Sequence, residues 1–287
     1  MSEPRDEYLS VRGLRLHLLR WEGSGVPFVL LHGLASNART WTAVGRALNQ
    51  AGHAVVAVDQ RGHGLSDKPA SGYGFDEVTA DLEALLETLG LSRRPILVGQ
   101  SWGGNVVLDF AARYPDISCG LALVDGGFIE LSARPGATWE RVSEELKPPL
   151  LVGTPRAELA ARLRQAHPDW SEEGIEATLA NFETLPDGTV RPWLTLDRHL
   201  EILHALWEHH ASQLYPRLRT PTLVVAAESG EAGWSDKRER VARAAASLPR
   251  ARVVWFKQTA HDVHVHRPAA LVRVMLDALA DGFFGPC

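Results

Sequence analysis

Short runs of apolar residues alternate along this chain with longer stretches in which apolar residues recur every three or four positions. Short, wholly apolar runs are typical of strands in a parallel sheet that is covered on both faces. They predict strands at residues 26–31, 54–58, 96–98, 121–124, 222–227 and 253–256, and an alternating pattern predicts a strand at residues 14–21. Residues 9–11 can pair with the strand at residues 14–21 across the turn at Arg12-Gly13.

Helices are predicted in the gaps between these strands. From Val78 to Leu89 the apolar side chains fall on one face of a helix, which Gly90 ends. Similar patterns predict helices at residues 41–48, 106–114, 240–248 and 269–279. This alternation predicts an α/β fold with an open, mostly parallel sheet and helices on both faces. Ligands of such sheets bind beyond the carboxyl ends of the strands.

One stretch, residues 128–215, interrupts the alternation. It contains no clear strand and is rich in Glu, Arg, Ala, Leu and Trp, a composition that favours helices. We therefore predict a core formed by residues 1–127 and 216–287, with 128–215 inserted as a helical cap. Aromatic residues are spread through the insert, and some of them are expected to face an apolar ligand pocket.

Composition narrows the class of protein. The chain has 287 residues, of which 45% are hydrophobic, enough for a large buried core. The formal net charge is -5 and basic residues are scattered among acidic ones, so no nucleic-acid partner is predicted. The polar N-terminus does not resemble a signal peptide, and no apolar segment reaches the roughly 18 residues of a membrane helix. We expect a soluble cytoplasmic protein without a membrane partner; the oligomeric state stays open.

The two cysteines, Cys119 and Cys287, are too few for a disulfide framework. Cys119 lies just before an apolar strand-like run. The simplest expectation for Cys119 is a small buried hydrophobic side chain.

A candidate nucleophile lies in Gly99-Gln100-Ser101-Trp102-Gly103, directly after one predicted strand and before a helix. In this strand–turn–helix context a Gly-x-Ser-x-Gly sequence exposes the serine hydroxyl at the sheet edge. The two outer glycines suit a turn that is too tight for side chains. A turn of glycine and serine without chemistry is the alternative reading of the same residues.

Serine is a weak nucleophile and needs a base that is itself oriented by a third group. His261 follows the last predicted strand and precedes the last helix, which places it at the same sheet edge as Ser101. His264 and His266 lie nearby, but no cysteine partner or His-Glu-x-x-His sequence accompanies them. No metal is therefore predicted, and the chemistry requires no cofactor.

The acid of the triad has several candidates. Asp125 closes the strand at 121–124, while Glu228, Glu231 and Asp236 follow the strand at 222–227. Each choice preserves the chain order serine, acid, histidine. Asp125 could equally be a strand-end residue that binds nearby backbone N–H groups.

An oxyanion hole needs two N–H donors. The backbone N–H of Trp102, directly after the serine, is expected to supply one of them. The loop after His32-Gly33 should supply the other, from Leu34.

Several of these segments together resemble the α/β-hydrolase superfamily over about residues 14–279, excluding the cap. They are Phe28-Val29-Leu30-Leu31-His32-Gly33, Asp59-Gln60-Arg61-Gly62-His63-Gly64-Leu65-Ser66, the serine turn and residues 261–268. The resemblance implies an α/β-hydrolase fold of the branch with cap-bearing esterases, lactonases and C–C-bond hydrolases. The Asp59–Gly64 stretch lacks the Lys-Ser/Thr ending of a phosphate loop and is interpreted as a structural turn.

Two departures from the family pattern matter. Epoxide hydrolases and haloalkane dehalogenases of this superfamily carry aspartate at the nucleophile position, where this chain has Ser101. Members usually place the acid after the strand matching residues 222–227, where Gly230 stands. Some relatives supply it from the end of the preceding strand, which matches Asp125. The resemblance therefore favours Asp125, with Glu231 second.

The sequence thus predicts a serine hydrolase that cleaves carboxylic esters and takes a small-molecule ester or lactone as substrate. A lactonase or a C–C-bond hydrolase with the same triad is the alternative within that chemistry. A small-molecule receptor on a hydrolase fold is the alternative outside it.

Overall fold

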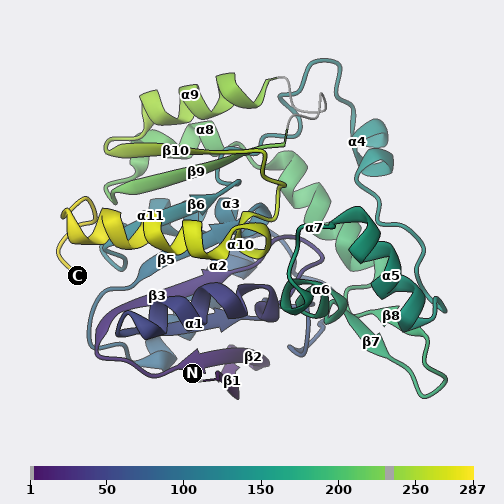
Figure 1. Ribbon diagram of the computed structural model, residues 1–287. Coiled ribbons are helices and arrows are strands. Elements are labelled where there is room, and N and C mark those ends of the chain that lie inside the picture. The colour runs from purple at the N-terminus through teal and green to yellow at the C-terminus, as the bar shows by residue number, and fades with distance from the viewer. Residues whose placement is uncertain (1–2, 230–235) are drawn as a thin grey trace.

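The main sheet explains the continuous apolar runs of the sequence. The computed structural model describes residues 3–229 and 236–287, in which eight strands pair in the order β1-β2-β4-β3-β5-β6-β9-β10 (Figure 1). They are β1 (Arg5–Val11), β2 (Leu14–Trp21), β3 (Gly25–Leu31), β4 (His53–Val58), β5 (Ile96–Gln100), β6 (Gly120–Val124), β9 (Thr222–Glu228) and β10 (Ala251–Lys257). Only the β1–β2 and β2–β4 pairs are antiparallel, so the predicted mostly parallel sheet is confirmed.

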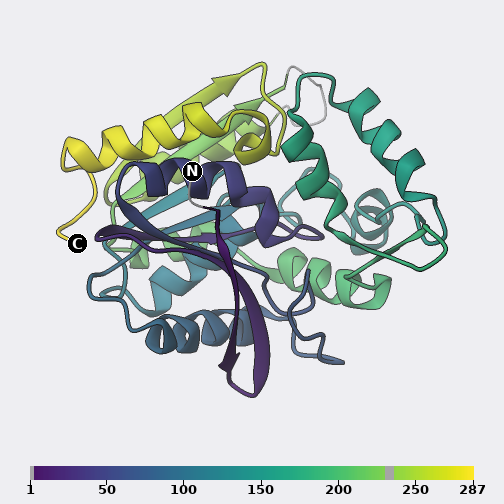
Figure 2. The ribbon, with the colours of Figure 1, turned by 60° about the horizontal axis from the view of Figure 1, so that its bottom comes forward.

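Helices cover both faces of this sheet. They are α1 (Thr42–Gln50), α2 (Phe75–Leu89), α3 (Trp102–Arg113), α9 (Lys237–Ser247), α10 (Val263–His266) and α11 (Pro268–Ala280), with a 3₁₀ turn η1 (Ala38–Trp41). Figures 1 and 2 show α1 and α11 side by side on one face. Ile96 and Val98 of β5 pack in the core on that face, whereas Leu97 between them packs in the core beneath α2 and α3. Both sides of the strand are buried, which is why its sequence does not alternate.

The segment between β6 and β9 contains α4 (Trp139–Glu145), α5 (Arg156–Ala166), α6 (Glu172–Leu179), α7 (Leu196–Glu208), α8 (Ala211–Leu214) and η2 (Tyr215–Arg217). Much of this segment, including α4 to α7, lies beyond one end of the sheet, whereas α8 packs against α3 of the core (Figure 1). The segment also contains a hairpin of β7 (Phe182–Thr184) and β8 (Val190–Pro192), so the expectation of no strand in this region is wrong. Strands of three residues are too short to show a two-residue period.

The two cysteines correct a second expectation. Cys119 and Cys287 form a disulfide with an S–S distance of 2.07 Å, although 168 positions separate them in the sequence. The C-terminal tail folds back to the start of β6, where the backbone N–H of Gly285 donates to the Cys119 carbonyl at 2.8 Å. Disulfides are rare in cytoplasmic proteins. The cytoplasmic location stays a prediction. No helix of the described residues is long and apolar enough to cross a membrane.

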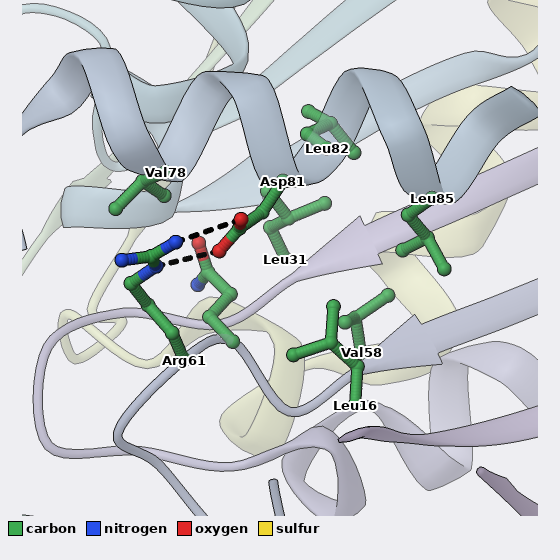
Figure 3. A pocket seen from close by; sticks show the side chains of 9 residues that line it. Leu16, Leu31, Val58, Arg61, Val78, Asp81, Leu82 and Leu85 are labelled. Carbon is green, nitrogen blue, oxygen red and sulfur yellow. Dashed lines mark hydrogen bonds and ion pairs between the residues drawn. The ribbon is translucent and has the colours of Figure 1, made fainter. Parts of the chain in front are cut away.

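A buried ion pair fixes the loop between β4 and α2 (Figure 3). Arg61 Nη2 lies 2.7 Å from Asp81 Oδ1, and Arg61 Nε lies 2.5 Å from Asp81 Oδ2. The pair borders a cavity of about 20 Å³ whose other walls are mostly aliphatic side chains of the sheet and α2. A two-pronged Arg–carboxylate contact restrains both partners strongly, so the loop that begins at Asp59 is anchored to α2.

Candidate active site

The serine turn has a backbone that only special residues permit. Ser101 lies between β5 and α3 with φ 53° and ψ -122°, a conformation that costs a non-glycine residue about 1–3 kcal/mol. A Cβ atom on Gly99 would lie 2.1 Å from the Gly103 carbonyl oxygen, and one on Gly103 would lie 2.5 Å from that of His32. The two outer glycines are therefore required by close approach of backbone, as the sequence predicts. The turn is held by a hydrogen bond from Ser101 N–H to the Val124 carbonyl at 3.0 Å.

His261 and Asp125, which are far apart in the sequence, meet at the carboxyl ends of the strands. The His261 Nδ1 and Asp125 Oδ2 atoms are 2.6 Å apart. Asp125 has a positive φ of 48°, and its side chain is 0% exposed. Its other carboxylate oxygen, Oδ1, accepts the backbone N–H of Ala227 at 2.9 Å. Asp125 thus binds a backbone N–H group, as expected for a strand-end residue, and it also contacts His261.

The pair shifts both pKa values. Burial alone would raise the pKa of Asp125, but the hydrogen bond and charge of His261, together with Lys237, hold it below its usual range. Burial likewise lowers the pKa of His261, but the hydrogen bond and charge of Asp125 outweigh that effect and raise it. The arrangement favours an ionised carboxylate beside an imidazole that can take a proton.

Ser101 lies beside this pair without a hydrogen bond to it. The Ser101 carbonyl packs against Gly126, where a Cβ atom would be only 2.1 Å away, and Gly126 directly follows Asp125. The neighbouring Gln100 side chain donates to the His261 carbonyl at 3.4 Å. No hydrogen bond joins the hydroxyl of Ser101 to His261 within the described residues. Such bonds are often long in enzymes without substrate, and the His261 side chain is 49% exposed.

Lys237, at the start of α9, contacts the Asp125 carboxylate and was not predicted from the sequence. Its ammonium nitrogen Nζ lies 2.9 Å from Asp125 Oδ1, 2.8 Å from Asp125 Oδ2 and 2.9 Å from the Ala227 carbonyl. No short motif marks a lysine in such a role, because its position depends on how α9 packs against the end of β9.

The competing acids have other partners where they are described. Glu228 pairs with Arg238, and Asp236 Oδ2 lies 3.2 Å from Arg240 Nε. Glu231 lies outside the described residues. Among the described candidates, Asp125 is the carboxylate that contacts His261.

Of the two expected oxyanion donors, Leu34 lies in the loop after β3, as predicted, and Trp102 is the first residue of α3. Within the described residues, neither the backbone N–H of Leu34 nor that of Trp102 donates to another protein group. The next N–H, that of Ala35, donates to His63 Nε2 at 3.2 Å, while His63 Nδ1 donates to the Arg61 carbonyl at 2.9 Å. This pattern fits a neutral His63 ring, and burial holds its pKa well below the usual value.

The two histidines after His261 are used structurally. His266 Nδ1 accepts the backbone N–H of Ala260 at 3.1 Å, and its Nε2 contacts the Asp169 carboxylate in the insert. His264 is fully buried against Trp41, with ring centres 4.3 Å apart. In the described part of the chain, no group of three or more His, Cys, Asp or Glu side chains could hold a metal ion.

Comparisons with known proteins agree with this architecture. A segment of 107 residues is 37% identical to the 2-(acetamidomethylene)succinate hydrolase of Mesorhizobium japonicum, covering 37% of this chain and 38% of that protein. Another of 119 residues is 37% identical to epoxide hydrolase A of Mycobacterium tuberculosis, covering 40% of this chain and 37% of that protein. The chain thus spans under two-fifths of the length of these curated relatives.

The fold similarity extends over nearly the whole chain. The crystal structure of E-2-(acetamidomethylene)succinate hydrolase matches with a TM-score of 0.80 at 23% identity, covering 96% of this chain and 99% of that one. The sequence profile described as the alpha/beta hydrolase family matches residues 28–274. This chain therefore belongs to the alpha/beta hydrolase family.

Proposed function

We propose that this protein is a serine hydrolase that cleaves carboxylic esters, with Ser101 as nucleophile, His261 as base and Asp125 as the orienting acid. The observation that carries the proposal is the 2.6 Å contact between His261 Nδ1 and the buried Asp125 carboxylate, beside the strained turn of Ser101. Strained backbone of this kind is typical of functional sites. Here the strain supports the proposal because the same turn exposes the serine hydroxyl at the sheet edge.

In the proposed reaction, His261 Nε2 takes the proton of the Ser101 hydroxyl as the oxygen attacks the carbonyl carbon of the ester. The tetrahedral oxyanion accepts hydrogen bonds from the backbone N–H groups of Leu34 and Trp102. His261 then gives its proton to the leaving alcohol, and an acyl-enzyme remains. Water activated by His261 hydrolyses the acyl-enzyme and restores the free serine. Asp125 holds the imidazole in the productive tautomer throughout, and no cofactor takes part.

The domain boundaries form part of the same proposal. Residues 1–127 and 216–287 would make the catalytic core, and 128–215 would cover the site and select a small-molecule substrate. The contact of His266 with Asp169 supports a cap that lies against the His261 loop.

Lactones and carbon–carbon bonds beside a carbonyl can be cleaved by the same machinery, so a lactonase or C–C-bond hydrolase is the nearest alternative. Epoxide opening is disfavoured despite the similarity to an epoxide hydrolase, because Ser101 stands where the resemblance implies an aspartate nucleophile in those enzymes. A receptor on a hydrolase fold would bind its ligand without multiple turnovers.

A fluorophosphonate probe tests the proposal directly. We expect one label per chain, at Ser101, and none in Ser101→Ala. A screen of p-nitrophenyl esters of short and long acyl chains, lactones and amides should then reveal turnover that Ser101→Ala lacks while keeping the wild-type melting temperature. Saturable binding with no more than one turnover would favour the receptor. Wild-type turnover in Ser101→Ala would refute the mechanism.

A further inference from the structure

We propose that Lys237 is a positioning residue of the triad, which fixes the Asp125 carboxylate against His261 and offsets part of its charge. This inference rests on the proposed function, because it concerns how the proposed base is tuned. It assigns a role to a residue that does not touch the reacting atoms.

All three N–H donors of the Lys237 ammonium group have protein partners. A lysine ammonium has three N–H donors. Lys237 Nζ contacts Asp125 Oδ1 at 2.9 Å, Asp125 Oδ2 at 2.8 Å and the Ala227 carbonyl at 2.9 Å. No donor remains to bind a substrate, so a role in substrate recognition does not fit the geometry.

The Asp125 carboxylate is held equally firmly. Its Oδ1 accepts the N–H of Ala227 and of Lys237, and its Oδ2 faces His261 and Lys237. Two oxygens with about four acceptor sites are therefore filled. Rotation of the carboxylate would break these contacts, and the side chain is 0% exposed, so water cannot replace them. Lys237 thus helps to keep Oδ2 directed at the imidazole.

The charge of Lys237 acts in the opposite direction to that of Asp125. An anion beside His261 favours its protonated form, and a cation 2.8 Å from that anion weakens the effect. Other charged or titratable groups also face this imidazole. They are Asp262 on its own loop, Arg240 on α9 and His264 on α10. Lys237 differs from them in binding the carboxylate that contacts the ring.

The Lys237–Asp125 ion pair is poorly screened by solvent, although the imidazole of His261 is 49% exposed. Asp125, Lys237 and His261 border a cavity of about 20 Å³, together with Phe128, Ile129 and Arg240. That volume holds about one water molecule. Lys237 itself is only 16% exposed. Charges in such surroundings interact more strongly than at an open surface.

Four variants separate these effects. Lys237→Met removes the charge and all donors, Lys237→Gln removes the charge but keeps a donor, and Lys237→Arg keeps the charge. Lys147→Met is the matched control, because it removes one positive charge from an exposed pair with Glu144. The readout is kcat/KM against pH with an ester that the wild type hydrolyses.

Loss of the positive charge should raise the pKa of His261, which acts as a base only when neutral. We therefore expect the acid limb of the profile to move to higher pH by about one unit in Lys237→Met and Lys237→Gln. Lys237→Arg and Lys147→Met should keep the wild-type limb. An unmoved limb in both neutral variants, or a rise in KM alone, would overturn the inference.

A second measurement does not depend on turnover. In the Ser101→Ala background, the pKa of His261 can be read by nitrogen-15 NMR with and without Lys237→Gln. An upward shift supports the inference, and an unchanged value overturns it. The Ser101→Ala variant is expected to be catalytically inactive. The NMR result is therefore independent of the Ser101 labelling experiment that tests the proposed function. If Lys237→Met fails to fold, Lys237→Gln retains a hydrogen bond to the carboxylate and carries the comparison.

Discussion

The backbone N–H of Ala35 donates to Nε2 of the buried His63 at 3.2 Å. Ala35 has φ 58° and follows Leu34, the proposed oxyanion donor. His63 belongs to the loop that the Arg61–Asp81 ion pair anchors to α2 (Figure 3). The His63 side chain therefore holds the backbone of the Leu34–Ala35 loop in place. In the proposed reaction, the N–H of Leu34 faces the negative charge that develops on the substrate oxygen.

Removal of the His63 acceptor should release this backbone. We expect His63→Leu to lower kcat by up to about 100-fold, the lower end of the loss caused by removing one oxyanion donor. KM should change less, because the contact acts mainly on the transition state. Steady-state kinetics and the rate of fluorophosphonate labelling measure the effect. His63→Gln, which keeps an acceptor in the side chain, is the control and should recover part of the rate; equal losses in both variants would contradict the role.

Asp125→Asn should remove the charge that orients and stabilises the imidazole. We expect kcat to fall by up to about 10⁴-fold, as when a triad histidine takes the wrong tautomer. Glu228→Gln is the matched control, since Glu228 pairs with Arg238 and should leave kcat near the wild-type value. Circular dichroism shows whether each variant is folded. If Glu231→Gln lost activity and Asp125→Asn did not, the acid would be Glu231.

His264 should make the fold sensitive to acid. Burial lowers its pKa to about 4, and neither ring nitrogen has a hydrogen-bond partner in the described residues. Because the folded pKa lies below the unfolded value, stability is full above about pH 6.5 and is lost as pH falls towards 4. The loss should approach roughly 3 kcal/mol. Urea unfolding at pH 7 and pH 4.5 should show a smaller difference for His264→Phe than for the wild type.

The Cys119–Cys287 disulfide should contribute to stability but not to catalysis. Reduction, or the double change Cys119→Ala and Cys287→Ser, should lower the free energy of unfolding by about 2–5 kcal/mol. Activity at 25 °C should persist, because Cys119 precedes β6 whereas Asp125 follows that strand. Thiol titration of the denatured chain without reductant should detect no free thiol. Detection of two thiols in freshly purified protein would contradict the bond.

The strands and helices of the core could be predicted because each has a simple periodic signature. The wholly apolar runs and the helical face from Val78 to Leu89 both correspond to described elements, and Gly90 ends α2 with φ 55°. The rule that the carboxyl ends of parallel strands share an edge placed His261 and several candidate acids together. The choice of Asp125 among those acids came from the family resemblance.

The features that the sequence did not predict depend on contacts between distant segments. The Cys119–Cys287 bond requires the C-terminal tail to return to β6, which no local pattern encodes. Lys237 reaches Asp125 only because α9 begins beside the end of β9. The β7–β8 hairpin is too short for its pattern to be distinguished from a turn.

The bridge made by His266 limits how freely the insert can be exchanged. One edge of its ring binds Asp169 in the insert, and the other binds the backbone of Ala260, one residue before His261. Grafting the corresponding segment of a relative, in order to change substrate range, should therefore also disturb the loop of His261, the proposed base, unless a carboxylate is kept at position 169. If the proposed roles of the insert and of His261 hold, a change of substrate range made through the insert should therefore also alter the reaction rate.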